Sequence, residues 1–165
     1  MKKIFLKLMI IPLLLIMAVG FASCGDKEPE EKYPLEVPFT EYSLEDTSCA
    51  WKTLEYGSEP NPSEIAVINS NEELENYFVC TEGSLPEIDF SKHTLLLARG
   101  LTSSGIYKIE KKLEQLSTDK YQLNVEIELN FLTVIESWNL TFITKKLNKD
   151  SEVKFNVTII DNLEN

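Results

Sequence analysis

The fold class of this chain is decided by the stretch YQLNVEIEL, which spans residues 121–129. Every second residue in it is apolar, and the residues between are glutamine, asparagine and two glutamates. Successive side chains of a β-strand point to opposite faces, so a period of two predicts a strand with one buried face and one face in water.

Six further segments have the composition of strands and are separated by turn-forming residues: 50–54, 65–68, 94–99, 106–116, 138–147 and 153–160. Segment 94–99 is apolar at consecutive positions, which predicts a central strand covered on both faces. Segment 153–160 alternates in the same way as 121–129. We therefore expect about seven strands.

One short helix is indicated between the second and third of these strands. Ser70 and Glu73 have the spacing of a capping box, in which the serine hydroxyl accepts from the backbone amide three residues later. Leu74, Tyr77 and Phe78 then fall on one apolar face of a helix. The pattern predicts a helix that ends near residue 79.

Together these elements predict an α+β domain that is mostly antiparallel β, a sandwich or an open barrel, with one short helix on its N-terminal side. We expect the domain to span residues 43–165. It is long enough to bury a sizeable core as a single unit.

The N-terminal 24 residues have the layout of a secretory signal. Three lysines precede an apolar run over 8–19, and the run is shorter than the roughly 20 residues of a membrane-spanning helix, which is the alternative. Ala22-Ser23-Cys24 resembles the lipobox of bacterial lipoproteins, which implies that Cys24 is acylated and that 1–23 is removed. The expected location is the outer membrane.

Residues 24–42 are expected to form a tether between the lipid and the domain. They are rich in acids and contain Pro29, Pro34 and Pro38, a composition that favours an extended chain. The acidic cluster 26–31 resembles the surface-export signal of lipoproteins in one group of Gram-negative bacteria, which implies display at the cell surface. The alternative is a solvated spacer on the periplasmic side.

The charge of the chain excludes one class of partner. The formal net charge is −11, and because 1–23 holds three lysines and no acid, the remainder carries 13 basic and 27 acidic residues. Such a surface repels phosphates, so we expect no nucleic acid partner, and attachment to the membrane must come from the lipid.

Two cysteines remain once Cys24 is assigned to lipid. Cys49 and Cys80 form an even pair in a chain that passes through an oxidising compartment, which favours a disulfide. Two buried free thiols are the first alternative. A metal site with His93 is the second, and it is disfavoured because His93 is the single histidine and no Cys-x-x-Cys spacing occurs.

No set of residues indicates catalysis. His93 lies near Asp89 and Ser91, but no Gly-x-Ser-x-Gly elbow accompanies it, and we expect no catalytic residues, no metal and no cofactor. The alternative is a hydrolase of extracellular or envelope polymers in which Glu126 and Glu128 supply acid–base chemistry.

Three segments carry a resemblance to a known family. Segments 67–74, 89–97 and 100–107 contain a Glu-Glu-Leu helix start, an Asp-Phe-Ser-Lys strand start and a glycine-rich loop, in that order. Over roughly 65–110 the chain resembles the C-terminal domain of PrcB-type lipoproteins, which are associated with surface protease complexes. The resemblance implies a non-catalytic β-rich domain that binds or helps to assemble a protein partner.

Two segments are candidates for the binding surface. Phe131-Leu132-Thr133-Val134-Ile135 lies between two strands where polar turn residues would be expected, so a connection here would expose large apolar side chains. The alternative is that the segment continues a strand or covers the end of the core. We add Thr102, Ser103 and Ser104 from the glycine-flanked loop, which we expect to be a hairpin.

Overall fold

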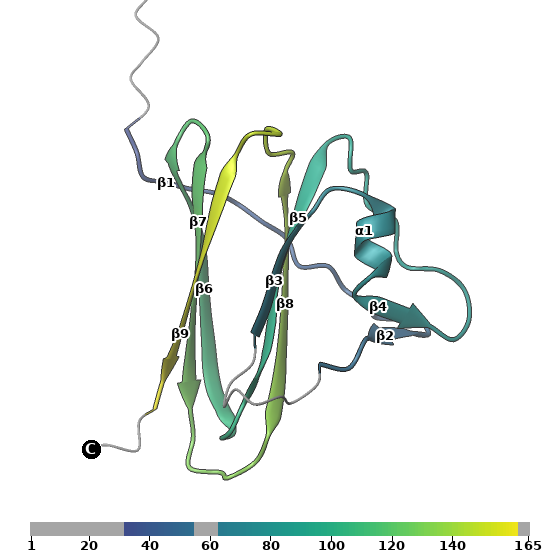
Figure 1. The fold of residues 1–165 in the computed structure, drawn as a ribbon, viewed down its shortest axis with the longest axis vertical. Coiled ribbons are helices and arrows are strands. Elements are labelled where there is room, and N and C mark those ends of the chain that lie inside the picture. The colour runs from purple at the N-terminus through teal and green to yellow at the C-terminus, as the bar shows by residue number, and fades with distance from the viewer. Residues whose placement is uncertain (1–31, 55–62, 162–165) are drawn as a thin grey trace, which may run out of the picture. The chain divides into compact units, whose positions relative to one another are not determined.

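The structure is a computed structural model that describes residues 32–54 and 63–161 (Figure 1). The signal segment 1–23, Cys24 and the acidic cluster 26–31 lie outside the described residues. Within the described part, no helix is long and apolar enough to cross a membrane.

The described residues form nine strands and one helix. In chain order they are β1 (Leu35–Glu36), β2 (Cys49–Trp51), β3 (Ser63–Ile68), α1 (Asn71–Glu75), β4 (Phe78–Cys80), β5 (His93–Thr102), β6 (Ile106–Ser117), β7 (Lys120–Leu129), β8 (Glu136–Lys145) and β9 (Glu152–Ile160). The expectation of a mostly β domain with one short helix is confirmed, with β1 and β4 added to the seven expected strands.

The strands form two larger sheets and one small ladder. Sheet A has the order β1-β6-β7-β9, sheet B has the order β3-β5-β8, and β2 pairs with β4. All pairs are antiparallel except β7 with β9, which is parallel. Neither sheet closes on itself.

Sheets A and B share one apolar core. Its buried members come from β5, β6, β7 and β8 and from Leu147 in the loop after β8: Leu96, Ala98, Leu113, Leu123, Val125, Ile127, Leu129, Trp138, Phe142 and Leu147. The alternation read in 121–129 is confirmed, because its apolar positions face this core and its polar positions do not.

Strand β5 is buried on both faces because it lies at the centre of sheet B. Leu96 and Ala98 enter the shared core, whereas Leu95 and Leu97 enter a second core beneath α1 and the β2–β4 ladder. This is the physical reason for its consecutive apolar residues, and it confirms the expected central strand.

The helix is shorter than we expected. The Ser70 hydroxyl accepts from the Glu73 amide at 3.2 Å, so the serine half of the expected capping box is present. The Glu73 carboxylate accepts instead from the amide of Asn69, one residue before the cap, at 2.6 Å. The helix ends at Glu75, and the prediction that it continues to residue 79 is wrong. Phe78 and Val79 are strand formers, and they lie in β4 opposite β2.

The disulfide between Cys49 and Cys80 is confirmed, with the two Cα atoms 3.9 Å apart. The backbone pairs on either side explain why these two positions can be bridged. Lys52 donates to the Tyr77 carbonyl and Thr81 donates to the Ser48 carbonyl. Because hydrogen-bonded pairs alternate along an antiparallel ladder, Cys49 and Cys80 form a non-hydrogen-bonded pair, where side chains approach most closely.

The folded part begins before the boundary that we placed after residue 42. Leu35 pairs with Gln115 of β6, Thr40 bridges Ile143 of β8, and the Tyr42 amide donates to Thr141 at 3.0 Å. Segment 35–42 therefore runs from the edge of sheet A to the edge of sheet B. Assigning it to the tether was wrong, because its apolar side chains pack on the cores.

Candidate functional site

Two connections between the sheets lie at one end of the domain. The first arch, residues 103–105, joins β5 of sheet B to β6 of sheet A, and the second arch, residues 130–135, joins β7 of sheet A to β8 of sheet B. The expected hairpin at 100–105 is wrong. β5 and β6 belong to different sheets, and Thr102 still lies within β5.

Backbone hydrogen bonds fasten the two arches to each other. The Gly105 amide donates to the Leu132 carbonyl at 2.8 Å, and the Asn130 amide donates to the Gly105 carbonyl at 2.7 Å. The Asn130 side chain accepts from the Leu132 amide at 2.9 Å. A Cβ at position 105 would lie 2.5 Å from the Asn130 side-chain oxygen, so a larger residue there would displace the side chain that accepts from Leu132.

The second arch exposes large apolar side chains. Phe131 is 79% exposed, Leu132 64%, Ile135 59% and Val134 47%. Tyr107, just after the first arch, is 73% exposed. We call these five residues the apolar patch. The segment is a connection and not a strand, so the alternative that it continues a strand is wrong.

The loop residues predicted for the surface differ in what they can contact. Ser103 is exposed and Ser104 is half-buried, but Thr102 is 0% exposed. The Thr102 hydroxyl donates to the Ser104 carbonyl at 2.7 Å, so it fixes the first arch from within. Placing Thr102 on the binding surface was therefore wrong.

Tyr107 belongs to the apolar patch and was not predicted. A register irregularity separates Ile106 from Lys108 in the β6–β7 ladder, and Tyr107 has no partner position in β7. Such a bulge turns a side chain away from the regular alternation. Segment 106–116 alternates imperfectly between apolar and polar residues, and this irregularity is the signal that could have indicated a bulge.

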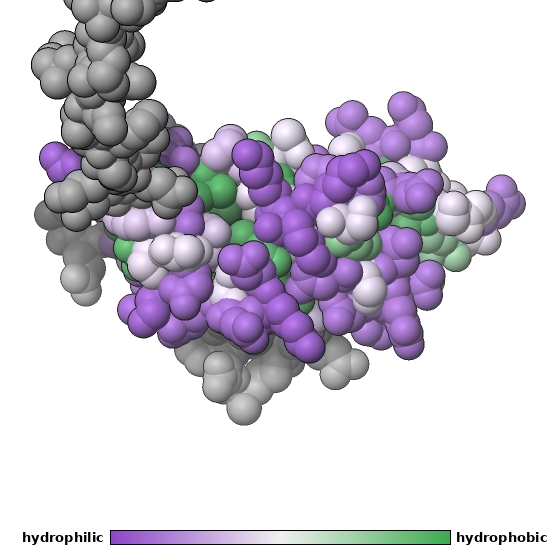
Figure 2. All heavy atoms as spheres, turned by 90° about the horizontal axis from the view of Figure 1, so that it is seen from above, coloured by the Kyte–Doolittle hydropathy of each residue, from purple (hydrophilic) through white to green (hydrophobic). Residues whose placement is uncertain are grey.

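The N-terminal segment joins the domain at the opposite end of sheet A. Leu35 pairs with Gln115, nine positions along β6 from Ile106, which is roughly 30 Å at about 3.3 Å per residue. The end of the molecule near β1 is mostly hydrophilic among its coloured residues (Figure 2). The apolar patch therefore lies far from the point at which the described chain begins.

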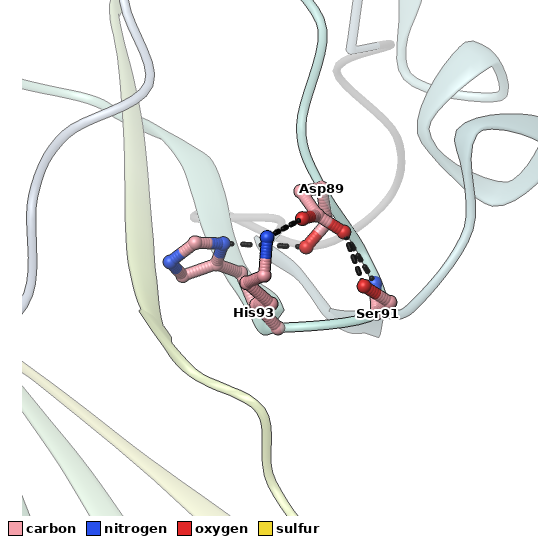
Figure 3. A network of polar contacts seen from close by, with 4 residues as sticks. Asp89, Ser91 and His93 are labelled. Atoms are coloured by element: carbon pink, nitrogen blue, oxygen red, sulfur yellow. Dashed lines mark hydrogen bonds and ion pairs between the residues drawn. The ribbon is translucent and has the colours of Figure 1, made fainter.

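Asp89, Ser91 and His93 are the residue types of a catalytic triad, but here they form a turn (Figure 3). The Ser91 hydroxyl donates to the Asp89 carboxylate at 2.5 Å, and the His93 ring nitrogen Nδ1 lies 3.2 Å from the Asp89 backbone carbonyl. Serine–histidine catalysis needs the serine hydrogen-bonded to the imidazole. Here the serine bonds the carboxylate instead.

The same turn holds the Asp89 carboxylate in its ionised form. The Lys92 ammonium donates to it at 2.6 Å and Ser91 donates to it as well, and these bonds lower the pKa of Asp89 to about 2. A carboxyl group with so low a pKa is a weak general base, and near neutral pH it carries no proton to donate as a general acid. The turn therefore positions the start of β5.

Glu126 and Glu128 lie on the water-facing side of β7, both half-buried. Glu126 lines an open depression of about 500 Å³ together with Glu36, Glu110, Lys111, Lys112 and Asn124. The residue directly opposite Glu126 is Glu110, and the residue opposite Glu128 is Lys108. The two glutamates named in the hydrolase alternative thus sit side by side on one open face.

The described residues contain no group of three histidine, cysteine or acidic side chains placed to hold a metal ion. Comparisons with protein-family models, with curated proteins and with solved structures found no match for this chain. The resemblance to PrcB-type lipoproteins stays a hypothesis, and function has to be argued from the residues and their geometry.

Proposed function

We propose that this chain is a lipid-anchored, non-catalytic envelope lipoprotein whose β-sandwich domain binds a protein partner through the apolar patch. The observation that carries the proposal is the exposure of Phe131, Leu132, Val134 and Ile135 on one connection. Contiguous exposed apolar side chains, as opposed to scattered ones, are typical of interaction sites.

The rigidity of the arches supports binding. The backbone bonds between Gly105, Asn130 and Leu132 fix the second arch before any partner arrives, so little ordering entropy is lost on association. Fully burying one such side chain contributes about 1.5–3 kcal/mol. Two or three anchors of this kind would contribute about 3–9 kcal/mol, which offsets part or all of the cost of association.

The position of the patch suits a protein held to a membrane at its N-terminus. Acyl groups on Cys24 would provide the anchor in the outer membrane, followed by the acidic segment as a spacer. The patch lies at the far end of sheet A from Leu35, so it is remote from the N-terminal start of the described domain. Display at the cell surface is part of the same proposal.

Changing Cys24 to alanine is expected to release the protein from the membrane fraction completely, because one residue carries the whole anchor. Fractionation with palmitate labelling measures this. The natural chain should pellet with membranes and take up label, whereas the variant should do neither. A variant that still pellets and is labelled would show that the lipobox assignment is wrong.

Changing Phe131 and Ile135 together to aspartate is expected to abolish recovery of the partner after crosslinking in intact cells, since two charges replace the apolar anchors. The matched control is Val79→Asp, because Val79 is 52% exposed on β4, outside the patch. The control should recover the partner as well as the natural chain does. Equal recovery by all three proteins would refute the role of the patch.

The hydrolase alternative rests on Glu126, which lines the depression on sheet A. The residues around Glu126 argue against this alternative. Glu110, opposite Glu126, forms an ion pair with Lys108 and raises the pKa of that lysine, so the carboxylate is engaged as a structural partner. The depression is also open, whereas glycoside hydrolysis needs two carboxyls on either side of the scissile bond. We therefore favour the binding function.

A further inference from the structure

Strand β9 presents a long free edge. Glu152–Ile160 pairs with β7 on one side in an unbroken register of nine residues. Among residues 32–54 and 63–161, no strand pairs with its other side. The strand contains no proline and no bulge, two of the devices by which proteins protect an edge, and its only charged residues are Glu152 and Lys154. It is therefore a template for a further strand.

The core beside this edge is incompletely covered. Ile65 and Val67 of β3 are opposite Ala98 and Leu96, so they face the side of sheet B that carries the shared core. They are nevertheless 50% and 39% exposed. Val67 and Val153 also line a cavity of about 340 Å³ between the two edges. An additional strand beyond β9 would cover these side chains.

We propose that this strand is β9 of a second copy of the chain, paired antiparallel about a two-fold axis at Asn156. Asn156 is the middle residue of β9, so this register pairs all nine residues. Facing the core, Val153 lies opposite Ile159 and Phe155 opposite Val157, which are favourable aromatic and β-branched pairs. On the water side, Lys154 lies opposite Thr158.

Charge is compatible with this register and disfavours the one centred on Lys154. The nine residues of β9 hold one acid and one base, and about Asn156 neither of them meets a like charge. Moving the axis by two residues to Lys154 would place two lysines opposite each other, which is destabilising. The Asn156 amide already donates to Asn124 of β7 at 3.2 Å, so the polar row would continue across the axis.

The two-fold symmetry also brings the β3 strands of the two copies toward each other. A two-fold axis between antiparallel neighbours is perpendicular to the sheet, so both copies keep their cores on the same side. The two four-stranded sheets A then form one continuous sheet, and the β3 edges of the two copies approach each other. Ile65 and Val67 would be covered by their own counterparts. This inference does not depend on the proposed function of the apolar patch.

Cysteine crosslinking tests the register in the full chain carrying Cys24→Ser, with Cys49 and Cys80 already bridged. Asn156→Cys is expected to form a disulfide-linked dimer on mild oxidation, because opposite residues lie within disulfide reach. Lys154→Cys alone should give no dimer, since its two copies would be about 13 Å apart. A mixture of Lys154→Cys and Thr158→Cys should crosslink.

Sedimentation velocity tests the interface without crosslinking. The parent chain is expected to sediment as a dimer, and Asn156→Lys, which places two lysines at the axis, as a monomer with unchanged circular dichroism. Thr118→Lys, on an exposed turn, is the control and should stay dimeric. A monomeric parent chain would overturn the proposal, and so would efficient crosslinking of Lys154→Cys with itself.

Discussion

Phe142→Ala is expected to lower the free energy of unfolding by about 3–5 kcal/mol, the range seen when a fully buried phenylalanine is truncated. Phe142 is 0% exposed and lies in β8, within the shared core. Its ring packs edge to face on Phe39 with the centroids 4.8 Å apart. The cavity cannot close easily, because β5 and the bridge from Thr40 to Ile143 hold the backbone on both sides.

Urea unfolding followed by circular dichroism measures this effect. Phe131→Ala is the control, since Phe131 is 79% exposed and its truncation should change stability by less than about 0.5 kcal/mol. Phe39→Ala should cost less than Phe142→Ala, as Phe39 is only partly buried. A loss below about 1.5 kcal/mol for Phe142→Ala would contradict the packing of segment 35–42 over β8.

The elements that the sequence predicted well are those whose signal is local. The alternation of 121–129 needs only one covering layer, and the structure places its apolar positions in the shared core. The consecutive apolar residues of 94–99 need two layers, and β5 has both. The Ser70 cap depends on residues three positions apart, and it was found as expected.

What could not be predicted depends on pairing between distant segments. Leu35–Glu36 has no period, and it becomes a strand only because the edge of β6 offers partners. Phe78 continued an apolar helical face, yet pairing with Trp51 turned it into part of β4. A glycine-rich loop of a few residues suits a hairpin or an arch equally well, so the sheet to which β6 belongs was not readable.

The residues of the candidate surface also divide into those with a local sequence signal and those without one. The exposure of Phe131 and Ile135 could be inferred, because a polar turn was expected and an apolar one was present. Thr102 was misplaced because burial of a threonine that bonds Ser104 leaves no mark in the sequence. Nor could the parallel pairing of β9 with β7 be read, since alternation is the same in either direction.

Changing Cys49 and Cys80 together to serine is expected to lower the free energy of unfolding by about 3–4 kcal/mol. The bridge closes a loop with a sequence separation of 31, and the loss of loop-closure entropy from the unfolded chain has this size. The double variant is the right change, because a single substitution would leave a reactive thiol. Reduction of the natural chain should have the same effect.

The loss should be concentrated in one part of the domain. β2 and β4 have three residues each and, within the part of the chain that the structure describes, pair only with each other, and a two-stranded ladder is marginal by itself. Sheets A and B keep the shared core without it. Hydrogen exchange should therefore rise in 49–51 and 78–80 while β5 to β8 stay protected.

This pattern of hydrogen exchange distinguishes two cases. In one the disulfide holds the β2–β4 ladder in place, and in the other the ladder is stable without it. Trp51 and Phe78 pack with ring centroids 4.4 Å apart, and Phe78 reaches Tyr42 at 5.8 Å, so the second core also holds the ladder in place. If those rings are sufficient, the double variant will lose less than about 1 kcal/mol and its exchange will not change. We expect the larger loss, because both strands are too short to stay paired through the rings alone.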